Sequence, residues 1–257
     1  MLVMPFITEY RQSDTLVIAA TGFTNKLSLP VDVFFREAGL SEMSSIVISD
    51  PSKRKMLGGL SPEFPSFFDC LDHLRREIAC LSPKKLLLLG SSGGAHTALL
   101  LGHLLEANYV VGFAPYPYLS IREISRRNDP VSGSMPRVVE ALDNLSGDVK
   151  KYFDLRKPLA EWNGKTRYYV HVSRYNRWDY RRALYLEGLP HLDIVAHPYS
   201  LHSTASSLCR DGRLKDCFQF PYKRTVTLKD LVLPAVELKS RFSKKIRRIA
   251  ATVSGQG

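Results

Sequence analysis

The segment Lys84–Leu105, KKLLLLGSSGGAHTALLLGHLL, holds the features that decide the fold. Four consecutive leucines predict a buried β-strand that ends at Gly90, and the apolar spacing that follows predicts a helix over 94–107. Between the two lies a short run of serine and glycine. This run is either an ordinary tight turn or a turn that holds one serine side chain clear of the backbone as a nucleophile.

Similar apolar runs recur along the chain, and none of them alternates cleanly between polar and apolar residues. Continuous apolar runs are typical of strands that are covered on both faces. The alternation of strands and helices predicts an α/β fold with a mostly parallel central sheet and helices on both faces. The expected strands are 14–22, 44–50, 84–90, 107–115, 166–173 and 191–198, and the expected helices are 29–39, 66–81, 94–107, 179–188 and 202–218.

The length of 257 residues fits one α/β domain over 1–222, followed by a basic segment at 223–257. Residues 116–164 contain no obvious strand and predict a helical insertion after the fourth expected strand. Ligands of such folds bind beyond the carboxyl ends of the strands. The insertion is therefore either a cap over the site or a peripheral helical subdomain.

Composition argues against several classes of protein. The hydrophobic share of 44% allows a sizeable core. No apolar run approaches the ~18 residues of a membrane span, and no basic region followed by a long apolar one marks a secretion signal. The four cysteines form no C-x-x-C pair. We therefore expect reduced thiols, a cytoplasmic location, no metal site and no cofactor.

The net charge of +11 is concentrated near the C-terminus, because residues 223–248 hold nine Lys/Arg and two acidic residues. Leu238, Phe242, Ile246 and Ile249 form one apolar stripe in this region, which indicates an amphipathic segment. It fits docking on the chain's own domain, on an anionic membrane surface, or on a partner protein. The rest of the chain is nearly balanced in charge, so we expect no specific nucleic-acid partner.

The turn at 90–94 matches the pattern G-x-S-x-G with Ser92 at its centre. A sharp strand-to-helix turn places the central residue in a strained backbone conformation, so the residues two positions away must be small. The serine oxygen then stands clear at the end of the strand. The N–H of Gly93, at the start of the helix, is placed to receive an oxyanion.

A nucleophilic serine needs a general base, and the base needs an orienting acid. In this architecture the acid and then the base follow later strands in chain order. The sequence predicts Asp179 as the acid and His202 as the base, with His197 as an alternative base. Asp179 also fits the N-cap of the next helix. The other candidates are predicted elsewhere: His96 and His103 at packing or surface positions of the helix after the turn, His171 in the core, and Asp193 within a strand.

The loop after the expected strand at 14–22 is predicted to complete the oxyanion site. Gly22 allows the backbone to turn close to a substrate, although a strand often ends at a glycine for steric reasons alone. We expect the N–H of Phe23 to be the second oxyanion donor, with Thr24 as the next candidate.

Aromatic and cationic residues lie close to the expected strand ends. Tyr116 and Trp178 are candidates for an apolar or sugar-stacking pocket, and core packing is the alternative. The segments DPSKRKM (50–56) and RYNRW (174–178) bring cations near the expected mouth. They fit an acidic substrate such as a carboxylate, a phosphate or a CoA group, or else a solvated surface.

Taken together, these residues resemble the α/β-hydrolase superfamily. The segments LLLLGSSGGAHTALLLGHLL, VVGFAPYPY, HVSRYNRWDYRRA and HPYSLHSTASSLCRDGRL are similar to bacterial hydrolases of polysaccharide or secondary-metabolite clusters, over roughly residues 14–218. The segment ISDPSKRKMLGGL (48–60) stands where those proteins have a loop that enters the site. The resemblance implies the fold and a Ser-His-Asp mechanism. The chain departs from it in lacking an HGGG run, which leaves the second oxyanion donor open.

The expected function is therefore hydrolysis of a carboxylic ester or thioester of a small molecule through an acyl-enzyme. Two alternatives stay open. One is acyl transfer with the same three residues, and the other is a catalytically silent binding or accessory protein with the same fold.

Overall fold

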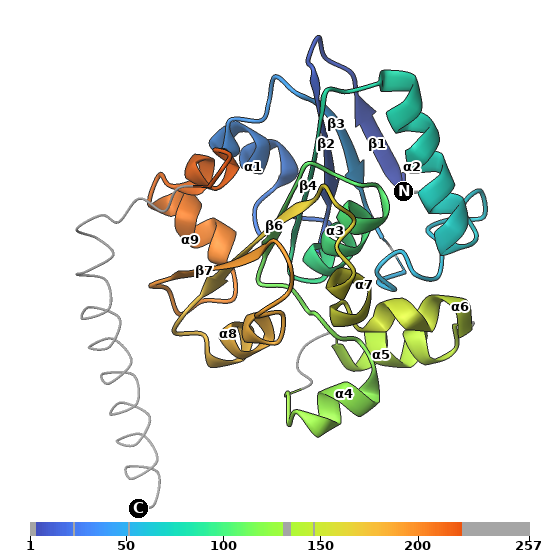
Figure 1. Cartoon of the computed structure of the whole chain (residues 1–257), viewed down its shortest axis with the longest axis vertical. Coiled ribbons are helices and arrows are strands. Elements are labelled where there is room, and N and C mark those ends of the chain that lie inside the picture. Colours follow the sequence, from blue (N-terminus) through green and yellow to red (C-terminus); the bar gives the residue numbers. More distant parts are fainter. Residues whose placement is uncertain (1–3, 23, 51, 131–134, 146, 223–257) are drawn as a thin grey trace, which may run out of the picture.

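The leucine run lies at the centre of a seven-stranded sheet (Figure 1). The computed structural model describes residues 4–22, 24–50, 52–130, 135–145 and 147–222. In this part of the chain the strand order is β1-β3-β2-β4-β5-β6-β7, and every neighbouring pair except β1 and β3 is parallel. The predicted mostly parallel sheet is thus confirmed. The strands are β1 (Phe6–Glu9), β2 (Thr15–Ala20), β3 (Ser44–Ile48), β4 (Lys85–Ser91), β5 (Tyr109–Phe113), β6 (Arg167–Ser173) and β7 (Leu192–His197).

The edge strand β1 was not predicted from the sequence. It pairs antiparallel with β3 and has only four residues, FITE. Phe6 is buried, whereas Ile7 is 49% exposed. A strand with one solvated face lacks the continuous apolar run that marks the strands of the sheet interior.

Helices cover both faces of the sheet, as predicted, and successive strand residues alternate between two apolar cores. Leu86 and Leu88 of β4 belong to one core, whereas Leu87 and Leu89 belong to the other. The first core is covered by α2 (Phe67–Leu81), α3 (Gly93–Leu104) and α8 (Arg177–Leu184). The second is covered by α1 (Val31–Ala38), α9 (Thr204–Arg210) and the 3₁₀ helix η2 (Leu214–Phe218), on the opposite side of the sheet in Figure 1.

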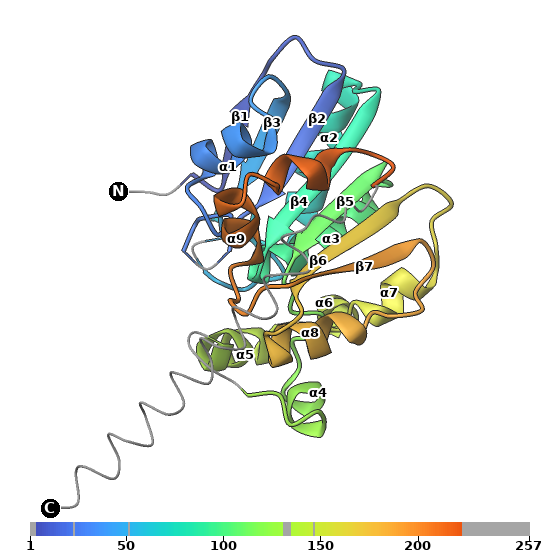
Figure 2. The same cartoon turned by 90° about the vertical axis from the view of Figure 1, so that its left-hand side faces the viewer.

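The segment between β5 and β6 is helical in the residues that the structure describes. Its helices α4, α5 and α6 lie beyond one end of the sheet (Figures 1 and 2). Apolar residues of this insertion, among them Ile124, Leu142 and Leu159, extend the core that α2 and α3 cover. The insertion is therefore packed onto the α/β body. Its elements are α4 (Ile121–Arg126), α5 (Met135–Asp143), α6 (Gly147–Lys150), η1 (Lys151–Phe153) and α7 (Arg156–Ala160).

The single helix predicted over 202–218 is wrong, because the structure divides it into α9 and η2. Gly212 lies between them with φ 67°, a left-handed conformation that ends a helix. None of the helices that the structure describes has the length and apolar character that a membrane span requires. The basic segment 223–257, with its predicted amphipathic stripe, lies outside the described residues.

Candidate active site

The turn between β4 and α3 holds Ser92 in an unusual backbone conformation. Its φ of 56° and ψ of −117° lie in a region that side-chain-bearing residues seldom adopt and that is typical of functional sites. A Cβ on Gly90 would lie 2.3 Å from the Gly94 carbonyl oxygen, and a Cβ on Gly94 would lie 2.1 Å from the Ala20 carbonyl oxygen. Glycine is therefore required on both sides of Ser92.

The same turn separates the roles of its two serines. Ser92 is partly exposed, and its N–H donates to the Phe113 carbonyl at 2.7 Å. Ser91 is buried, and its Oγ lies 2.5 Å from Ser28 Oγ. Ser92 is thus the serine whose hydroxyl is presented at the carboxyl end of the sheet, at the start of α3.

His202 and Asp179 meet Ser92 at this end of the sheet. His202 lies in the loop between β7 and α9, and its Nε2 is 2.9 Å from Ser92 Oγ. Its Nδ1 is 2.8 Å from Asp179 Oδ2. The Asp179 side chain is 2% exposed and the His202 side chain is 40% exposed. The three groups form one continuous hydrogen-bonded chain, in which the tautomer with Nδ1–H donating to Asp179 leaves Nε2 as the acceptor for the Ser92 hydroxyl.

Helix α8 positions Asp179 through a cap that the sequence analysis misplaced. Asn176 is the N-cap residue, and its Oδ1 accepts from the Asp179 N–H at 3.2 Å. Asp179 stands in the first turn instead, so its carboxylate is available to side chains. One oxygen contacts His202, and the other accepts from Arg182 Nη1 at 3.2 Å.

Arg182 connects this acid to the helical insertion. Its guanidinium binds Asp129 bidentately, through Nε at 2.8 Å and Nη2 at 2.7 Å. The Tyr118 hydroxyl donates to the same Asp129 carboxylate at 2.8 Å. Burial disfavours the charge on Arg182, but the hydrogen bonds and charge of Asp129 outweigh burial and raise the pKa of Arg182. Neither Asp129 nor Arg182 was predicted from the sequence, where the i, i+3 spacing of Asp179 and Arg182 is the one available signal.

Three other histidines, His96, His171 and His197, are buried. His171 and His197 are both buried, with His171 Nδ1 2.9 Å from His197 Nε2. Burial, with the neighbouring His197, lowers the pKa of His171 well below its usual value. His96 on α3 places its two ring nitrogens 2.7 Å and 3.1 Å from the carbonyl oxygens of Tyr116 and Tyr152. His96 thus fixes the insertion to α3, and burial lowers its pKa to about 4.

Tyr116 and Trp178, the two aromatic residues predicted to line the pocket, have different neighbours. The ring of Tyr116 lies 6.1 Å from the His202 ring, and the Arg182 guanidinium lies 4.3 Å from the Tyr116 ring centre. Trp178 lies beside Arg177 and Arg181 on α8, with its ring 5.4 Å and 6.0 Å from their guanidinium carbons.

The oxyanion loop after β2 is described in part. A Cβ built on Gly22 would lie 4.0 Å from Ser92 Cβ, so Gly22 lies close to the serine, as the loop position predicts. Thr24 is exposed. Phe23, the predicted second donor, lies outside the described residues.

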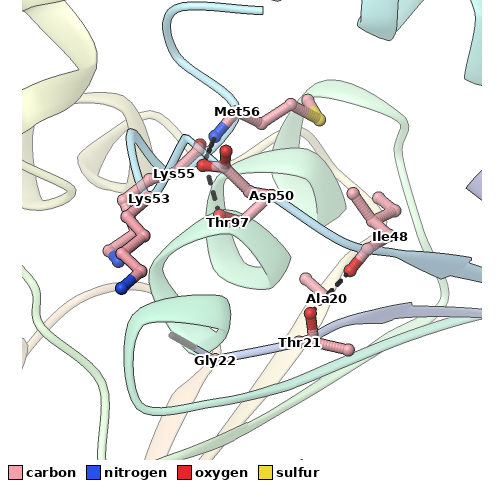
Figure 3. A pocket seen from close by; sticks show the side chains of 9 residues that line it. All are labelled: Ala20, Thr21, Gly22, Ile48, Asp50, Lys53, Lys55, Met56 and Thr97. Carbon is pink, nitrogen blue, oxygen red and sulfur yellow. Dashed lines mark hydrogen bonds between the residues drawn. The ribbon is translucent and has the colours of Figure 1, made fainter. Parts of the chain in front are cut away.

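A small pocket lies beside the turn, between the ends of β2 and β3 and the start of α3 (Figure 3). Gly22, Asp50 and Thr97 contribute to its wall, and so does Lys55 from the loop after β3. Lys55 is 5% exposed. The cations of segment 50–56 were predicted near the mouth of the site, with solvated surface as the alternative, and that alternative is wrong for Lys55. In the described part of the chain, no group of three or more His, Cys, Asp or Glu side chains is arranged to hold a metal ion.

Comparison with known proteins identifies the fold. No protein-family model and no curated protein matches the sequence. Among solved structures, the capsule O-acetyltransferase of Neisseria meningitidis serogroup A superposes with a TM-score of 0.58 and 16% identity, over 83% of this chain and 91% of that one. A putative esterase from Staphylococcus aureus gives 0.53 and 12%, over 86% and 80%. An alpha/beta hydrolase enzyme from the metagenome of lagoon sediments of Mar Chica, Morocco, gives 0.54 and 15%, over 82% and 92%.

These likenesses, at identities of 12–16%, establish the architecture. The chain has the α/β-hydrolase fold, which confirms the fold that its sequence motifs implied.

Proposed function

We propose that this protein is a serine hydrolase that acts on a carboxylic ester or thioester through an acyl-enzyme. One observation carries the proposal: the hydrogen-bonded chain from Asp179 through His202 to Ser92, which ends on a serine with φ 56°. A serine becomes a nucleophile when an adjacent base accepts its proton and a third group orients that base.

In the proposed acylation step, Ser92 Oγ attacks the substrate carbonyl carbon while its proton passes to His202 Nε2. Asp179 holds the imidazole in the required tautomer and stabilises its charged form. The tetrahedral intermediate then collapses, and His202 gives its proton to the departing alcohol or thiol. Arg182 positions Asp179 from behind, since its Nη1 donates to the carboxylate oxygen that His202 does not use, and Asp129 in turn holds the Arg182 guanidinium.

The negative oxygen of the intermediate requires hydrogen-bond donors that are in place before the reaction. We propose the N–H of Gly93, the first residue of α3, where unpaired backbone donors and the helix dipole favour negative charge. The N–H of Phe23 remains the proposed second backbone donor, and Gly22 beside Ser92 is consistent with a close approach of that loop. Tyr116, next to His202, is proposed to line the substrate pocket.

Acyl transfer to a hydroxyl group is a second candidate, because it differs only in the acceptor of the second step. One observation favours it: the structural neighbour from N. meningitidis is an O-acetyltransferase that has been solved in complex with CoA. In both reactions the acyl-enzyme on Ser92 is the same, and His202 activates either water or an acceptor hydroxyl.

Labelling with a fluorophosphonate, followed by intact-mass and peptide mapping, tests the proposal. We expect one adduct on Ser92 that is absent from Ser92→Ala and strongly reduced in His202→Ala. Ser91→Ala is the matched control, because Ser91 is the neighbouring serine and its hydroxyl contacts Ser28. It should label like the wild type. A wild-type protein without an adduct would instead favour a silent binding protein.

A second assay separates hydrolysis from transfer. The unlabelled wild-type protein is compared on p-nitrophenyl acetate and on acetyl-CoA, each with and without a sugar hydroxyl acceptor. Release of acetate that is independent of the acceptor supports the hydrolase. Formation of acetylated acceptor, with a matching decrease in released acetate, supports the transferase.

A further inference from the structure

The loop after β3 carries a lysine into the space beside the nucleophile. A Cβ built on Gly93 would lie 2.4 Å from Lys55 Nζ and 2.7 Å from Lys55 Cε. The amine of Lys55 therefore occupies the place that a side chain on the residue after Ser92 would take. Because Gly93 also offers the N–H of the proposed oxyanion site, the amine lies next to that site.

The loop that carries Lys55 is tightly held. Asp50 Oδ2 accepts from the Met56 N–H at 3.0 Å, and Asp50 Oδ1 accepts from the Ser52 hydroxyl at 2.6 Å. Thr97 on α3 donates to the Lys55 carbonyl at 3.3 Å. Lys55 itself has φ 58°, an unfavourable conformation for a lysine. Strained residues of this kind are typical of sites where the surrounding structure positions a functional group.

The charge on Lys55 is sensitive to its surroundings. Burial lowers the pKa of Lys55 to about 7, the negative charge of Asp50 raises it, and the positive charge of Lys53 lowers it. On the other side, Lys55 faces α3, where its charge contributes to the low pKa of buried His96. Figure 3 shows Lys53 and Lys55 extending in the same direction from the loop. The ammonium form is thus present below about pH 7 and is lost as the pH rises.

We propose that the Lys55 ammonium is a catalytic group that binds the oxyanion of the tetrahedral intermediate, alongside the N–H of Gly93. This inference rests on the proposed function of Ser92. As Ser92 Oγ forms its bond to the carbonyl carbon, the carbonyl electron pair moves onto the oxygen and the serine proton moves to His202. Lys55 donates a hydrogen bond to that oxygen and keeps its own proton. An ammonium has three N–H donors, so this contact is compatible with its other partners.

The proposal also accounts for a departure in the sequence. The loop after β2 has no HGGG run. Few backbone donors are then available to the oxyanion. A cationic donor from the loop after β3 would strengthen the site, because charged hydrogen bonds are roughly twice as strong as neutral ones.

The test compares Lys55→Met with the wild type on p-nitrophenyl acetate and in the rate of fluorophosphonate labelling. Lys84→Met is the control, because Lys84 is 78% exposed and precedes β4, at the opposite end of that strand from Ser92. Loss of one oxyanion donor typically lowers kcat by about 10²–10³-fold. We expect a fall of this size for Lys55→Met, with little change in KM and slower labelling. A melting temperature that is not lowered at pH 7 would separate this effect from unfolding, since the substitution removes a buried charge.

The pH profile gives a second readout that leaves Lys55 in place. Because the ammonium is the active form, wild-type kcat should decline as the pH rises through about 7. Lys53→Met removes a neighbouring positive charge, so the decline should move to higher pH. Lys55→Met should lack this decline altogether.

Two results would overturn the inference alone: Lys55→Met with kcat within twofold of the wild type, or a wild-type profile that shows no decline and does not respond to Lys53→Met. In both cases Ser92 would still label, and the proposed hydrolase would stand. The proposed function would be overturned if the wild type is not labelled and Ser92→Ala keeps the activity of the wild type. The proposed role of Lys55 would then fall with it.

Discussion

At the scale of single residues, the candidate site depends on one serine in a costly backbone conformation. Residues held in such regions cost on the order of 1–3 kcal/mol each. The Ser92 N–H bond to the Phe113 carbonyl maintains this conformation. The flanking glycines allow α3 to approach β2 closely enough to form the turn, so the geometry of Ser92 depends on the absence of two side chains.

We predict that Gly94→Ala destabilises the protein by about 1–3 kcal/mol, the usual cost of overpacking. The new Cβ would lie 2.1 Å from the Ala20 carbonyl oxygen, so α3 must move away from β2. Labelling of Ser92 should slow as well. Urea unfolding measures the stability, and Gly147→Ala is the control, because nothing lies within 4 Å of a Cβ at that position. Equal unfolding midpoints for the two variants would contradict the steric account.

At the scale of elements, a buried ion pair links the insertion to α8. Arg182 and Asp129 have side chains that are 7% and 6% exposed, and Arg182 also reaches Asp179. Asp129 of the insertion is therefore connected to Asp179 through Arg182. The network makes the position of Asp179 depend on the segment between β5 and β6.

We predict that Asp129→Ala costs about 3–5 kcal/mol, because it leaves the buried Arg182 guanidinium without its bidentate partner. Arg182→Met should also destabilise the protein. The double variant should lose less free energy of unfolding than the two single variants lose together. The difference, measured by urea unfolding, should be about 0.5–3 kcal/mol. Additive effects would mean that the two side chains act independently.

At the scale of the whole molecule, each face of the sheet contains a buried histidine with a lowered pKa. His96 lies on α3 beneath the insertion, and His171 stacks on Phe113 in the opposite core. An unfolded chain binds protons at these groups near pH 6.5, whereas the folded protein does so only at lower pH. Between these values the unfolded state binds more protons, so stability falls as the pH falls.

We predict that the wild type loses stability from pH 6.5 toward pH 4, and that His96→Gln reduces this loss by up to about 3 kcal/mol, at about 1.4 kcal/mol for each tenfold change in proton affinity. Urea midpoints at several pH values measure the effect. His191→Gln provides the matched control, because His191 is exposed. A His96→Gln profile parallel to that of the wild type would show that His96 does not contribute.

The sequence by itself determined the sheet interior, because a buried parallel strand needs an unbroken apolar run, which is a local property. It also determined the turn at 90–94, since the pattern G-x-S-x-G is contained in five residues, although the close approach of Gly94 to Ala20 comes from the tertiary structure. The sequence did not predict the edge strand β1, which has too few apolar residues to stand out. It also did not predict the division of the last helix, which depends on the conformation of Gly212.

Only the tertiary structure decided which side chains meet. The order of Ser92, Asp179 and His202 along the chain predicts three strand ends at one edge of a sheet, but their distances follow from the packing of α3, α8 and the loop before α9. Asp129 and Arg182 are 53 residues apart, so no local pattern pairs them. Lys55 reads as a solvated cation in its sequence context. Whether a charge is solvated or buried depends on what packs over it, and here the loop after β3 and the start of α3 enclose it.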